Sequence, residues 1–186
     1  MVRHLDDAPA DFRTALQSLR HAPTHPAVHL TEVPAPGRIA PYAAAISGEL
    51  HDEELEASGR FVVLHDPDGQ TAWEGTMRVV ALVKAAVEPE VGRDELWGEV
   101  AWSWLEESLA DAPHRALGGS VTKVSSTSFG ELAERPDEVT IELRASWTPT
   151  TTDLAPHIAA WADLMAACAG VPPLPEGVRA LPGRTA

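Results

Sequence analysis

Apolar and polar residues alternate without a break over residues 139–147. The apolar positions are Val139, Ile141, Leu143, Ala145 and Trp147, and the positions between them hold threonine, glutamate, arginine and serine. Successive side chains of a β-strand point to opposite faces of the sheet. The pattern therefore predicts a strand over residues 138–148 with one buried face and one face in solvent.

A second strong pattern covers residues 60–83, which read RFVVLHDPDGQTAWEGTMRVVALV. Two apolar runs rich in β-branched residues flank the sequence DPDG at residues 66–69. Proline presets φ at the first corner of a β-turn, and glycine takes the positive φ that other residues resist. We therefore predict that the chain reverses at residues 66–69 in an antiparallel hairpin at the centre of a sheet, with arms at residues 59–65 and 73–87.

Three further segments, residues 28–33, 42–50 and 120–129, have the composition of strands, although the alanines of residues 42–50 also suit a helix. Prolines interrupt the chain at positions 34, 36 and 41. Because proline cannot donate a ladder hydrogen bond, residues 34–41 are predicted to form an ordered arm across the sheet.

Apolar residues recur at helical spacing in residues 11–21, 94–110 and 153–169, which predicts three helices. In the second helix they form a broad arc, made of Leu96, Trp97, Val100, Ala101, Trp104, Leu105 and Leu109. The third helix carries a stripe made of Leu154, Ile158, Trp161, Met165 and Cys168. Residues 171–186 form a proline-rich tail that we expect to pack on the domain.

Together these elements predict an α+β fold. The expected order is a helix, three to four strands, a helix, two strands and a helix, with an antiparallel sheet of five to six strands covered by helices on one face. A chain of 186 residues suits a single domain over residues 1–186, with its core in residues 11–170.

The net charge argues against two classes of binding partner, nucleic acids and anionic membranes. Twenty-eight acidic residues oppose fourteen basic ones, which gives a formal charge of −14. Nucleic-acid binding needs a basic face that displaces counterions from phosphates, and anionic membranes attract basic segments. We therefore expect neither nucleic acid nor a membrane as a partner. The single cysteine, Cys168, excludes an intrachain disulfide and suits the reducing cytoplasm.

Several strings of the chain together resemble a known family. They are IAPYAAAISGEL, VVLHDPDGQTAWEGTMRVV, EVAWSWLEESL, TKVSSTSFGELAERP and AGVPPLPEGVRALP. Over residues 11–182 the chain resembles domain-of-unknown-function family 3000, an uncharacterised family of high-GC Gram-positive bacteria. The resemblance implies a single-domain cytosolic protein and supplies no catalytic residues. It also implies a gene neighbour for a ribonuclease D-like enzyme, which adds the hypothesis that the protein assists RNA processing by contacting that enzyme.

The chain carries few candidates for catalysis or metal binding. A calcium loop needs oxygen ligands over about twelve residues, and the sequence around Asp66 and Asp68 offers only its first corner. Cys168 falls on the apolar stripe of the third helix, where a small core residue is expected. The sequence also lacks a G-x-S-x-G motif, a phosphate-binding loop and the zinc-binding motif H-E-x-x-H. We predict no metal and no cofactor, and the sequence favours a protein without catalytic activity.

The tryptophans give the main functional hint. At about 100° per residue, Trp102 lies about 160° from Trp104 on the predicted helix, at the far edge of the apolar arc. A half-exposed tryptophan often anchors a protein interface. Our first hypothesis is therefore a protein-binding or adaptor module, self-association included. Its candidate contacts are Trp102, Trp73 and Trp147, with Glu99 and Glu106 at the rim.

The alternative hypothesis is a small-molecule-binding protein or an enzyme of unrecognised type. Its pocket would lie near the central hairpin and hold His65, Asp66, Trp73 and Glu74. This hypothesis requires the four side chains to converge on one concave site.

Overall fold

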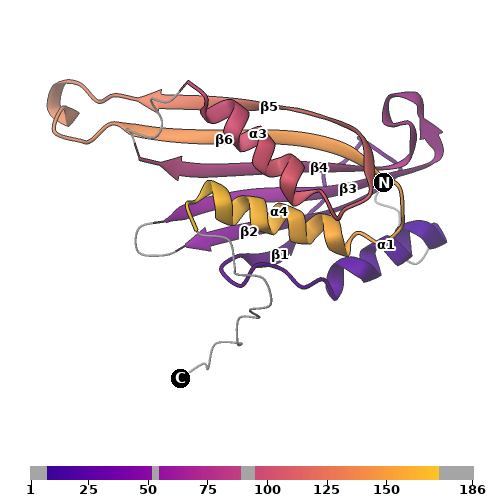
Figure 1. The fold of residues 1–186 in the computed structure, drawn as a ribbon. Coiled ribbons are helices and arrows are strands. Elements are labelled where there is room, and N and C mark those ends of the chain that lie inside the picture. Colours follow the sequence, from indigo (N-terminus) through magenta and orange to yellow (C-terminus); the bar gives the residue numbers. More distant parts are fainter. Residues whose placement is uncertain (1–7, 52–54, 89–94, 172–186) are drawn as a thin grey trace.

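The computed structural model of the protein describes residues 8–51, 55–88 and 95–171 (Figure 1). Six strands form one antiparallel sheet in the order β1-β2-β3-β4-β6-β5. The strands are β1 (His29–Val33), β2 (Tyr42–His51), β3 (Glu56–Gln70), β4 (Gly75–Val87), β5 (His114–Ser126) and β6 (Glu138–Pro149). The β3–β4 hairpin occupies the middle of the sheet, as the sequence predicts.

The helices α3 (Trp97–Ser108) and α4 (Ala155–Cys168) lie across the same face of the sheet (Figure 1). In this layer α4 contacts β2, β3 and β4, whereas α3 contacts α4 and the edge strand β5. A further helix, α1 (Ala10–Arg20), packs against α4 near the β1 side of the sheet. The predicted α+β fold is confirmed.

The core lies between the sheet and its helices. The five apolar positions of β6 that alternate in the sequence are all buried, and the alternate positions of β4 from Met77 to Ala85 are buried with them. These side chains share one core cluster with α3 and α4, so the positions between them, which are polar in β6 and mixed in β4, face the opposite side of the sheet.

A pair of glycines in the sheet lies directly against side chains of α4. Gly48 on β2 and Gly59 on β3 are opposite each other in the register. A Cβ atom at Gly59 would lie 2.8 Å from Trp161 and 2.5 Å from the Leu82 carbonyl oxygen, so a side chain has no room there. The Trp161 indole N–H donates a hydrogen bond of 3.1 Å to the same carbonyl. The two glycines therefore form a notch that seats α4 on the sheet.

The two long helices differ in how much of their surface is buried. Burial extends around most of α4, because the sheet, α1 and α3 all contact it. The apolar arc predicted for α3 is too broad, since Leu96 is 58% exposed and Val100 is 39% exposed. Only the row Trp97, Ala101, Leu105 and Leu109 is fully inside, because α3 has partners on one side only.

The prediction of a reversal at residues 66–69 is wrong. Strand β3 continues to Gln70, which pairs with Gly75, and the chain reverses through the short helix η2 (Thr71–Trp73). Glu74 closes this reversal in the left-handed region, with φ of 56°. The pairing of β3 and β4 is irregular at residues 66–69 and then resumes, so this segment is a bulged part of the strand.

Residues 34–41 form the predicted arm on the face of the sheet opposite the helices. Ala35 and Ala40 pack there against a second apolar cluster that contains Val62, Leu64 and Trp73. Val62 and Leu64 alternate along β3 with Phe61 and Val63, which belong to the main core, so the arm and the helices cover opposite faces.

The remaining predictions differ at the element ends. Strand β5 begins at His114 rather than at residue 120 and ends at Ser126 rather than at residue 129. The predicted tail, residues 171–186, lies outside the described residues except for its first residue. Val171, the last described residue, packs partly buried against the core.

Candidate functional site

Two of the three tryptophans predicted as contact residues lie inside the protein. Trp147 is fully buried on β6, and its indole N–H donates to His157 Nδ1 at 3.0 Å. Trp73 is the last residue of η2 in the reversal of the central hairpin and is 9% exposed, in the apolar cluster beneath the arm. Burial removes both side chains from the surface that a partner would meet.

His65 lies on the face of the sheet that the helices cover. Its ring stacks on Phe12 of α1, with 5.6 Å between the ring centroids, and lies 6.1 Å from the ring of Tyr42. Burial lowers the pKa of His65, against the opposing effect of Asp11, the Thr76 backbone and Asp66. His65 thus packs as a largely neutral ring on the face of the sheet opposite the cluster that holds Trp73.

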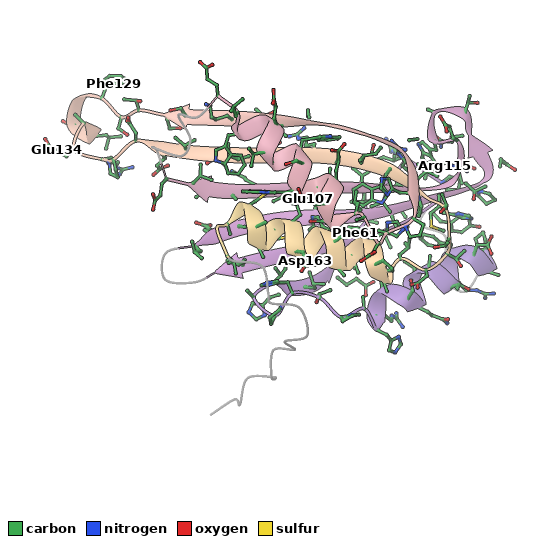
Figure 2. The ribbon with its side chains drawn as sticks, viewed as in Figure 1. Phe61, Glu107, Arg115, Phe129, Glu134 and Asp163 are labelled. Atoms are coloured by element: carbon green, nitrogen blue, oxygen red, sulfur yellow. The ribbon has the colours of Figure 1, made fainter. Side chains whose placement is uncertain are left out.

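Asp66 and Glu74 take part in the geometry of the hairpin end. Asp66 accepts hydrogen bonds from the Asp68 backbone N–H at 3.2 Å and from the Gln70 amide at 3.1 Å. The carbonyl oxygen of Glu74 accepts a hydrogen bond from Arg115, which Figure 2 labels at this end of the sheet. The structure therefore does not bring His65, Asp66, Trp73 and Glu74 together in one pocket.

Trp102 keeps a partial exposure on α3. It is half-buried, and its indole N–H donates to the Glu106 carboxylate at 3.0 Å. Its neighbours Trp97 and Trp104 pack edge to face, with ring centroids 5.4 Å apart. Glu99 is exposed on the same helix, so the predicted tryptophan and its acidic rim remain accessible.

The side chain that organises the polar end of the central hairpin is Arg78, which the sequence patterns did not single out. Arg78 of β4 donates to the Ser146 carbonyl and hydroxyl at 3.2 and 2.7 Å, to the Thr148 hydroxyl at 3.1 Å and to the Ala116 carbonyl at 2.9 Å. The Thr148 hydroxyl donates in turn to the Trp73 carbonyl. Arg78 thus links β4, β5, β6 and the reversal. Its position in an otherwise apolar run was the only signal of this role in the sequence.

Burial holds the remaining reactive side chains in their neutral forms. It lowers the pKa of His157 to about 4, together with repulsion from His114 and against attraction by Asp153. It raises the pKa of the Cys168 thiol to about 12. In an active site, a partly buried nucleophile or base lies beside a charged group that stabilises its reactive form. Both groups have the properties of core residues. Within residues 8–51, 55–88 and 95–171, no three His, Cys, Asp or Glu side chains form a group able to hold a metal ion.

Three exposed large apolar side chains lie close together in the sequence, at the end of the β5–β6 hairpin. We call residues 124–138 the hairpin tip; it includes the short helix η3 (Gly130–Leu132). In the tip Phe129 is 78% exposed, Val124 is 50% exposed and Leu132 is 47% exposed. The pairing of β6 with β4 stops at Val139, and Figure 1 shows the tip extending past the other strands. Phe129 lies outside β5, although the sequence predicts it at the end of a strand, and the sequence patterns did not indicate this surface.

The fold and surface define an α+β protein in which His157 and Cys168 are buried and three exposed large apolar side chains, Val124, Phe129 and Leu132, lie at the end of one hairpin. The chain belongs to the family described as Protein of unknown function (DUF3000), whose model matches residues 8–179, and this confirms the resemblance seen in the sequence. Neither the curated proteins nor the solved structures gave a match to the chain. In the described part of the chain, every helix is too short or too polar to cross a membrane.

Proposed function

We propose that this protein is a non-catalytic binding module for another protein, and that the hairpin tip is its contact surface. The exposure of Phe129 carries the proposal. From Thr122 to Glu138 every side chain except Ser128 is exposed, so nothing else in the described structure covers this aromatic ring (Figure 2). Exposed apolar groups rimmed by polar residues mark interaction surfaces.

The energetics favour Phe129 as an anchor. Burying a phenylalanine side chain that starts in water contributes about 1.5–3 kcal/mol. Phe129 retains most of this potential at 78% exposure, and it contributes little to the stability of the fold. Leu132 and Val124 add further exposed apolar area to the tip. Large aromatic side chains, phenylalanine included, contribute strongly to the energetics of protein interfaces.

The charge of the tip indicates the chemistry of the partner. Four acidic residues, Glu131, Glu134, Asp137 and Glu138, oppose one base, Arg135, for a net charge of 1 − 4 = −3. This charge repels nucleic acid and anionic membranes. The matching partner is a protein with an apolar pocket bordered by lysine or arginine. The buried, single Cys168 suits action in the reducing cytoplasm.

The experiment compares the wild-type chain with a tip variant and a matched control. The tip variant carries Phe129→Ser and Leu132→Ser, and the control carries Ile39→Ser, which removes another exposed apolar side chain at 54% exposure. A partner is captured on the wild-type protein, purified, and its affinity for each variant is measured by calorimetry at low and high salt.

We expect the tip variant to bind at least about 30-fold more weakly, which corresponds to about 2 kcal/mol. The control should bind as the wild type does, and the wild-type affinity should fall with added salt because the tip is acidic. Equal binding of the tip variant and the wild type, or binding that salt leaves unchanged, would overturn the proposal.

A further inference from the structure

A groove with a volume of about 1020 Å³ lies between α1, the β1–β2 edge of the sheet and the arm of residues 34–41. Ligand pockets commonly have volumes of about 300–1,000 Å³. Most of the groove's lining is apolar and only partly buried. The larger apolar side chains on the helix face of the sheet are Phe12, Leu16, Leu19, Leu30, Ile46 and Ile158.

The groove exists because β1 is short. Its five residues pair with β2 residues 45–49 only. The first three residues of β2, 42–44, therefore have no β1 partner at this edge of the sheet. There α1 and the arm flank the sheet edge in place of a strand, and Phe12 lies with its ring centroid 6.0 Å from that of Tyr42. A helix and an irregular arm cannot fill this space as a paired strand would.

Two arginines line the groove. Arg20 ends α1 and Arg38 lies in the arm, and both are exposed. Glu32 is the only carboxylate among the lining residues, and no ion pair joins either arginine to another described residue. Arg38 also adopts a left-handed φ of 69°, which residues other than glycine rarely hold. In a chain of charge −14, these two cations mark the groove as a place where an anion is favoured.

We propose that this groove binds a single-chain amphiphile with an anionic head. The apolar body of the ligand lies along Leu16, Leu30 and Ile46. The carboxylate or phosphate head lies at the exposed rim of the groove, which Arg20 and Arg38 make cationic, and guanidinium groups suit both anions. This site is separate from the hairpin tip, so it adds a ligand to the protein-binding function proposed above.

The test titrates the full chain with decanoate, decyl phosphate and 1-decanol. We expect the two anions to bind at least about tenfold more tightly than the alcohol, since a favourable contact of about 1.4 kcal/mol changes affinity tenfold. The tighter anion identifies the head group. The double variant Arg20→Gln, Arg38→Gln should lose this preference and retain weak binding of all three probes.

Arg13→Gln serves as the matched control, because Arg13 is an exposed arginine of α1 that does not line the groove. It should bind the anions as the wild-type chain does. The proposal is overturned if the full chain binds none of the probes, if the alcohol binds as tightly as the anions, or if Arg13→Gln weakens binding as much as the double variant.

Discussion

Replacing Gly59 with alanine tests how α4 is seated on the sheet. The new Cβ atom would lie 2.5 Å from the Leu82 carbonyl oxygen, 2.8 Å from Trp161 and 3.0 Å from the Met165 sulfur. The first of these atoms belongs to the backbone of a central strand, so it cannot turn aside as the end of a flexible side chain can. Adding a methyl group to a packed core costs about 1–3 kcal/mol.

The same substitution displaces the carbonyl that accepts the Trp161 indole hydrogen bond, which is worth about 0.5–1.5 kcal/mol. We therefore expect the free energy of unfolding to fall by about 2–4 kcal/mol. Urea unfolding monitored by tryptophan fluorescence measures this change.

Gly98→Ala is the matched control. A Cβ atom at Gly98 meets nothing within 4 Å, and the residue lies in α3, where alanine is favoured over glycine by up to about 1 kcal/mol. The two substitutions should therefore change stability in opposite directions. A Gly59→Ala protein as stable as the wild type would refute the glycine notch as the seat of α4.

Three further predictions concern polar and reactive side chains. The pKa of His157 is lowered from 6.5 to about 4 in the folded protein, so its contribution to stability is complete above about pH 6.5 and should decline by about 3 kcal/mol as the pH falls towards 4. His157→Asn, which keeps an acceptor near the Trp147 indole, should remove that decline, and an unchanged pH dependence of unfolding would contradict this. Arg78→Ala removes four hydrogen bonds and should lower the free energy of unfolding by about 2–4 kcal/mol, with only partial recovery in Arg78→Lys because an ammonium group cannot span the same acceptors; full recovery would contradict the network. Cys168 is buried with a pKa of about 12 and should resist iodoacetamide until urea unfolds the chain, so rapid labelling of the native protein would show that this core is open.

The sequence predicted best the features that a short local pattern determines by itself. Alternation over residues 139–147 identified β6 and its buried face, because a strand in an antiparallel sheet needs only its own period to separate the faces. The DPDG motif correctly predicted a positive φ at Gly69, which is 73°. It did not predict where the chain reverses, because that depends on pairing of Gln70 with Gly75 across two strands.

Exposure proved harder to predict from the sequence than secondary structure. Leu96 and Val100 fit a helical apolar arc, yet they face outward because α3 has a neighbour on one side only. Phe129 is of a residue type common in strands, and only the end of the β4–β6 pairing at Val139 shows that no described strand continues beside it. The groove beside α1 likewise depends on where β1 stops, which no single segment encodes.

Site-specific photo-crosslinking tests the proposed protein-binding function most directly. A photoreactive phenylalanine replaces Phe129 in one protein and Ile39 in another, since both positions are exposed and apolar. We predict that position 129 crosslinks to one defined protein in stoichiometric amount, that position 39 does not, and that high salt reduces the yield. Crosslinks of equal yield and identity at both positions, or none at position 129, would contradict the hairpin tip as the contact surface.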